Sequence, residues 1–127
     1  MKVILALLIA ALGFSTTNVS GTWTGEIKEV GSTESSPAYI QLQQEKGKIT
    51  GVTGPSKDVN FPIKNAILLE DQLSFSVHSI NREDPKEGAD WTFDLKVTGD
   101  TMEGTAHAVN TSDNHSWDMA LKVARQK

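Results

Sequence analysis

The chain has 127 residues and no cysteine. That length suits one domain with one core, and the lack of cysteine excludes a disulfide framework, thiol chemistry and a lipid-acceptor cysteine. With 12 basic and 16 acidic side chains the formal net charge is −4, which does not favour nucleic acid or anionic membranes as partners.

The first residues have the pattern of a secretory signal peptide. Lys2 precedes an apolar run over residues 3–14, and small polar residues follow it. This run falls short of the ~20 apolar residues that span a bilayer. We expect cleavage after Ser15, with Thr17 as the alternative. The chain is therefore predicted to consist of a signal peptide (1–15) and one domain (16–127), secreted or periplasmic and without a membrane anchor.

Short segments with a two-residue apolar period follow one another through the rest of the chain. The first runs from Thr22 to Glu29, where Trp23 and Ile27 alternate with polar residues. Seven more segments follow, at 38–44, 49–53, 59–69, 73–79, 91–97, 102–108 and 115–125. Pro62 and Asn65 indicate a bulge or a sheet edge inside the fourth. Because no segment has a sustained helical period, an all-β domain of eight strands is predicted.

The connections between these strands alternate in length. Tight turns are predicted at 45–47, 70–72 and 98–100, and longer loops at 31–37, 54–58, 81–89 and 110–114. In a meander, successive connections fall at opposite ends, so the long loops share one end, the mouth, and the tight turns share the other, the floor. Eight antiparallel strands can also close on themselves, which removes exposed edges. The predicted fold is an eight-stranded antiparallel up-and-down (meander) barrel.

Closure would bring the two ends of the domain together at the floor. The last strand would lie beside the first, with Arg125 close to Trp23. A guanidinium over an indole is a favourable pair, worth roughly 0.5–2 kcal/mol. These two residues are the predicted structural closure of the barrel.

The opening strand carries a family resemblance. Gly21-Thr22-Trp23 resembles the Gly-x-Trp motif of the lipocalin and calycin barrels, in which a basic residue of the last strand covers the tryptophan, the position of Arg125 here. The opening and residues 47–51 are also similar to avidin-type barrels, but Gly25 stands where those place a biotin-binding asparagine. The chain looks closest to small exported bacterial proteins that begin Ser-Gly-Thr-Trp-x-Gly, a resemblance that implies no general function.

The sequence offers little for catalysis or metal binding. Strand alternation points His78 and His107 outward and only His115 inward, and no short-spaced pair of histidines is present. No serine lies in a nucleophile-elbow pattern. The acidic residues of the loop at 81–89 lack the regular spacing of a calcium loop. We therefore expect a protein that is not an enzyme and that needs no cofactor or metal.

The inward-facing residues differ between the two ends. Leu69, Leu73, Val97, Met102 and Val123 would crowd the floor, whereas Gly104, Ala106 and Ala108 would leave space along one wall. The candidate ligand-contacting set combines aromatic planes with a few polar groups near the mouth: Glu29, Phe61, Phe75, Ser79, Arg82, Trp91, His115 and Trp117.

Two interpretations of the mouth remain open at this point. Trp91 and Trp117 either line a pocket or plug that end of the barrel. The first favours a secreted, lipocalin-like binding protein for a small, hydrophobic or amphipathic molecule. The second favours a module with a filled core that binds a protein or glycan through the loops at 31–37 and 81–89.

Overall fold

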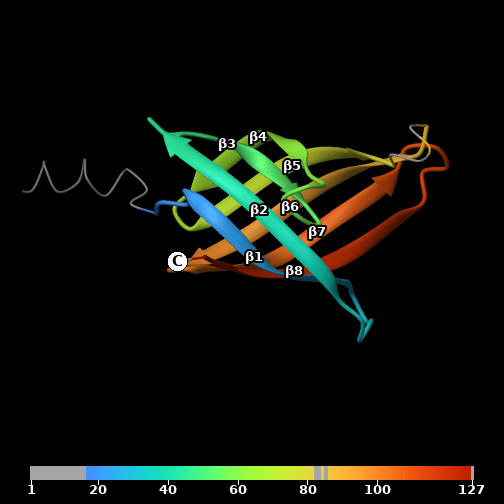
Figure 1. Ribbon diagram of the computed structural model, residues 1–127, viewed down its shortest axis with the longest axis horizontal. Coiled ribbons are helices and arrows are strands. Elements are labelled where there is room, and N and C mark those ends of the chain that lie inside the picture. Colours follow the sequence, from blue (N-terminus) through green and yellow to red (C-terminus); the bar gives the residue numbers. More distant parts are fainter. Residues whose placement is uncertain (1–16, 82–83, 85, 127) are drawn as a thin grey trace, which may run out of the picture.

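The computed structural model describes residues 17–81, 84 and 86–126. Eight antiparallel strands form a closed barrel in which each strand pairs with its neighbours in sequence and the last pairs with the first (Figure 1). The strands are β1 (Gly21–Glu29), β2 (Ser36–Glu45), β3 (Lys48–Gly54), β4 (Phe61–Leu69), β5 (Gln72–Ile80), β6 (Gly88–Thr98), β7 (Thr101–Asn110) and β8 (Ser116–Arg125). The predicted meander barrel is confirmed.

Two sequence predictions concern residues that are not described. The signal peptide (1–15) and the proposed cleavage after Ser15 lie outside the described residues. Within the described part, no helix is long and apolar enough to cross a membrane.

Alternation of inward and outward side chains gives the strands two different faces, and β6 shows it most clearly. In β6, Phe93, Leu95 and Val97 are buried, whereas the residues between them are exposed. A period of two places successive side chains on opposite faces of a sheet. The side chains facing inward from all strands therefore meet in one core.

Tight turns join the strands at the floor. Lys46 and Gly47 connect β2 to β3, and both have positive φ, 53° and 81°. This backbone matches the right-handed twist of a hairpin. The longer connections all lie at the opposite end, while both termini of the described chain lie at the turn end (Figure 1). The predicted mouth and floor are both present.

Closure occurs between β1 and β8. Trp23 pairs with Arg125 and the ladder continues to Glu29 and Met119. The two backbones approach so closely that a Cβ on Gly25 would overlap the carbonyl oxygen of Lys122. Gly25 therefore permits the closing contact.

A bulge in β4 changes which residues face the core. Asn65 has a φ of 56°, and the pairing register shifts between Lys64 and Ile67. The expected irregularity is confirmed, but its effect on the alternation was not anticipated. Leu68 packs against the core, whereas Leu69 is 70% exposed, so the prediction that Leu69 fills the floor was wrong.

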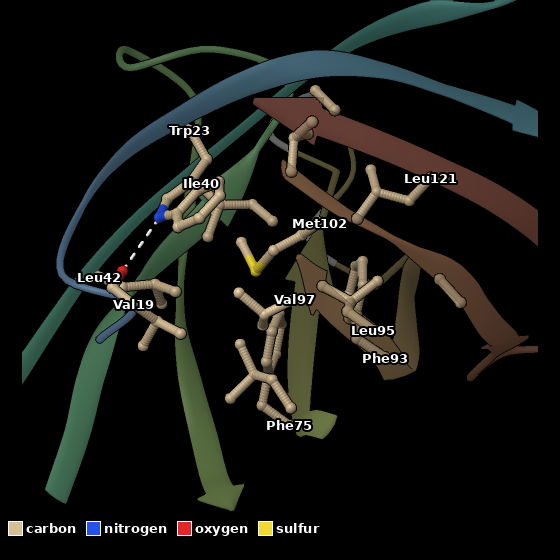
Figure 2. Close-up of a cluster of buried hydrophobic side chains, with 14 of the residues drawn as sticks. Val19, Trp23, Ile40, Leu42, Phe75, Phe93, Leu95, Val97, Met102 and Leu121 are labelled. Atoms are coloured by element: carbon tan, nitrogen blue, oxygen red, sulfur yellow. Dashed lines mark hydrogen bonds between the residues drawn. The ribbon is translucent and has the colours of Figure 1, made fainter. Parts of the chain in front are cut away.

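The floor half of the barrel is densely filled. Trp23, Ile40, Leu42 and Met102 are buried there together with Val19 (Figure 2). Val19 precedes the first strand, and its carbonyl accepts a hydrogen bond of 3.0 Å from Trp23 Nε1. The chain entering the barrel is thus part of the packed floor.

Candidate functional site

A cavity of about 450 Å³ opens at the mouth. Its walls come from inward-facing residues of the strands and from the loops that follow β3 and β5. The volume lies within the ~300–1,000 Å³ of pockets that hold small molecules. Trp91 and Trp117 line this space and leave it open.

One wall of the cavity is aromatic. Trp91 and Phe93 stack with centroids 6.0 Å apart, and Trp117 meets Trp91 edge to face at 6.0 Å. Below them Phe75 stacks on Phe93 at 4.8 Å. These contacts link the rings from the core to the mouth, and such geometries add to simple area burial.

A hydrogen-bond relay fixes the orientation of Trp91. Its Nε1 donates to Ser79 Oγ over 3.0 Å, and Ser79 Oγ lies 3.4 Å from the carbonyl oxygen of Ala89, to which it donates. Ser79 and Ala89 are directly paired across β5 and β6. The indole therefore presents ring surface to the cavity while its polar atom is satisfied within the wall.

The wall formed by β1 to β4 is also mainly apolar. Ile27, Ala38 and Phe61 supply apolar surface there. Thr53, although polar and buried, donates from Oγ1 to the Tyr39 carbonyl over 2.9 Å. In the described part of the chain, every buried side-chain nitrogen or oxygen has a hydrogen-bond partner. The cavity interior consequently presents mainly apolar surface.

Polar groups gather at the rim of the cavity. Asn81 and Glu87 belong to the loop between β5 and β6, and Asn110 ends β7. Asn110 Oδ1 accepts hydrogen bonds from the backbone and hydroxyl of Ser112, at 2.9 and 2.8 Å. Glu87 is exposed and is the one formally charged side chain among the described residues that line the cavity.

The cavity brings together half of the candidate ligand-contacting residues. Phe61, Ser79, Trp91 and Trp117 line it. Phe75 lies one layer deeper, in the core against Phe93.

Two of the remaining candidates, Glu29 and His115, do not line the cavity. Glu29 is exposed at the end of β1. His115 is also exposed, with its ring stacked on Trp117 at 5.8 Å. Arg82 lies outside the described residues.

The prediction from sequence did not include the rim residues Glu87 and Asn110. It also assigned the open space of the cavity to residues that do not line it. Glu87 and Asn110 lie at strand ends or in loops, where alternation gives no direction. The expected small-residue wall, Gly104, Ala106 and Ala108, is not part of the cavity lining. A Cβ on Gly104 would overlap the carbonyl oxygen of Asp94, so this glycine allows close strand packing.

The opposite end of the barrel is sealed around Trp23. The Arg125 guanidinium carbon lies 4.4 Å from the centre of the Trp23 ring. The same guanidinium donates to the carbonyls of Ser20 and Asn18 and to Asp100 Oδ1. Arg125 thereby ties the first and last described segments together at the floor.

The outward histidines form isolated pairs. His78 lies 2.7 Å from Asp90, and His107 lies 2.8 Å from Asp118. Both histidines are exposed on the outer face of the sheet, as predicted. No group of three or more histidine, cysteine, aspartate or glutamate side chains that could hold a metal ion occurs among the residues described.

Comparisons with protein-family models, curated proteins and solved structures found no match for this chain. The cavity and the chemistry of its lining are therefore the features of this protein that bear on its function.

Proposed function

We propose that this protein is an exported, lipocalin-like binding protein that holds a small, partly hydrophobic molecule at the open end of its barrel. The observation that carries the proposal is the cavity of about 450 Å³ at the mouth, lined largely by apolar side chains. The Gly-x-Trp opening and the Arg125 contact on Trp23 support the lipocalin-like assignment.

The physical basis of binding would be desolvation. Burial of apolar surface contributes about 25 cal/mol per Å², so a ligand burying roughly 200 Å² would gain about 5 kcal/mol before the costs of association. The aromatic wall of Trp91, Phe93 and Trp117 supplies large, rigid surfaces for this contact. The relay through Ser79 holds that wall in place before a ligand arrives.

Binding without catalysis fits the lining better than an enzyme does. Ser79 Oγ is engaged by Trp91 Nε1 and the Ala89 carbonyl. Glu87 lies at the exposed rim, and no histidine is among the described residues that line the cavity. A nucleophile held beside a general base, the usual arrangement for covalent catalysis, is not formed by these groups.

The test uses the neutral fluorescent probe N-phenyl-1-naphthylamine. We expect saturable binding at one site with a blue-shifted, enhanced emission. Ala38→Phe places a ring in the cavity and should abolish this signal, because Ala38 is buried and lines the cavity. Ala124→Phe, on the exposed outer face of β8, is the matched control. Circular dichroism verifies that both variants fold.

Tryptophan replacements locate the bound probe. Trp91→Phe and Trp117→Phe should each reduce energy transfer to the probe, whereas Trp23→Phe at the sealed floor should change it least. Absence of saturable binding, or equal binding by Ala38→Phe and the wild type, would contradict the proposal. That result would favour the module that acts through its loops.

A further inference from the structure

The distribution of polar groups in the cavity bears on the class of ligand. The inner polar side chains already have partners: Thr53 bonds to Tyr39, and Ser79 bonds to Trp91 and Ala89. A ligand polar atom placed there would lose its water and gain little in return. The polar part of an occupant is therefore favoured at the rim.

The described part of the rim carries one negative charge, on Glu87. Glu87 lines the cavity and is exposed. None of the salt bridges found among the described residues involves it. Asp84 and Lys86 belong to the same loop, but neither lines the cavity. A ligand carboxylate at this rim would meet a like charge, whereas an amine would meet an opposite one.

We infer that the ligand is a neutral or cationic amphiphile, with its apolar part against the aromatic wall and its head group beside Glu87. A fatty-acid-type anion is disfavoured. This inference rests on the proposed function, which supplies the site, and adds the charge class of the molecule that occupies it.

The experiment compares three probes that share one apolar chain. Decylamine, decan-1-ol and sodium decanoate are titrated at neutral pH, below micelle formation, by displacement of N-phenyl-1-naphthylamine. We expect decylamine to bind about fivefold more tightly than decan-1-ol, the factor given by unit charges about 4 Å apart in water, and decanoate to bind most weakly. The advantage of the amine should shrink as added salt shortens the Debye length from about 30 to 3 Å.

Glu87→Gln should remove the advantage of decylamine over decan-1-ol. Glu34→Gln is the matched control, since Glu34 is exposed in the loop between β1 and β2 and does not line the cavity. Decanoate binding as tightly as decylamine, or an amine preference that survives Glu87→Gln, overturns the inference and leaves the proposed function standing. Failure of all probes, including the naphthylamine, overturns both.

Discussion

The floor and the mouth of this barrel are built from the same eight strands, yet one end is filled and the other is hollow. At the floor, two-residue turns bring neighbouring strands together, and Val19, Trp23 and Met102 occupy the interior. At the mouth, longer loops separate the strand ends, and Trp91 and Trp117 pack against the wall. Whether an end of the barrel is filled therefore depends on the way in which its large side chains are anchored, and not only on their size.

Anchoring differs between the tryptophans of the two ends. Trp23 is held by Arg125 on one face and by the Val19 carbonyl at Nε1, and it is fully buried. Trp91 is held by Ser79 on its own wall. A tryptophan fixed to its wall leaves the centre of the barrel free. The comparison predicts that stability is concentrated at the floor and ligand binding at the mouth.

The largest expected effect is from Trp23→Ala. Removing a fully buried ring from a packed floor should lower the free energy of unfolding by about 3–5 kcal/mol. Trp117→Ala, which truncates a partly exposed ring beside a cavity, should cost less than about 2 kcal/mol. Urea unfolding followed by circular dichroism measures both. Equal losses at the two positions would mean that the floor is not the more stable end.

Added volume should also cost more in the packed core than at the cavity. Ala106 is buried in the core and does not line the cavity. Ala106→Leu should therefore cost about 1–3 kcal/mol through overpacking. Ala38→Leu grows into existing space, so its cost should stay below about 1 kcal/mol while binding of the naphthylamine probe weakens. A larger loss of stability for Ala38→Leu would show that the mouth is already filled.

The closing contact should have a moderate effect. Arg125→Met retains an apolar stem but loses the contact on Trp23 and the hydrogen bonds to Ser20, Asn18 and Asp100. We expect a loss of about 1–2 kcal/mol. Lys122→Met, exposed on the same strand, is the control and should change stability by less than about 0.5 kcal/mol. Similar unfolding midpoints for the two variants would contradict a closing role for Arg125.

Most of the fold could be predicted from the alternation of side chains along the strands and from the lengths of the connections. A period of two gives each strand a face, and alternating long and short connections give the barrel two different ends. The pairing of Trp23 with Arg125 then follows from closure, because the first and last strands must meet. These features depend on local pattern and topology, which a sequence displays directly.

The lining of the cavity could be predicted less well from these patterns. Glu87 lies in a loop, where no periodicity predicts direction, and Val19 reaches the floor from a segment before the first strand. Glu29 and His115 fall at inward positions of the predicted strands, but both side chains are exposed in the structure, and His115 precedes β8. Alternation predicts on which face of a strand a side chain lies. It gives no information about how far along the strand the barrel interior extends.

The bulge at Asn65 is the local feature that most altered the predicted floor, and it gives the smallest effect we expect. Asn65 has a φ of 56°, a conformation that asparagine and glycine tolerate and that β-branched residues do not. Asn65→Val should cost about 1 kcal/mol, because a β-branched side chain is strained in the left-handed region. Asn65→Gly should leave stability within about 0.5 kcal/mol of the wild type.

Urea unfolding compares the two variants directly. The bulge brings Leu68 into the core while Leu69 remains exposed, so strain here should weaken the floor side of β4 and leave the cavity unchanged. We therefore expect Asn65→Val to bind the naphthylamine probe as the wild type does. A variant that loses probe binding along with stability would show that the two ends of the barrel are coupled through β4, and the separation of stable floor from binding mouth would have to be given up.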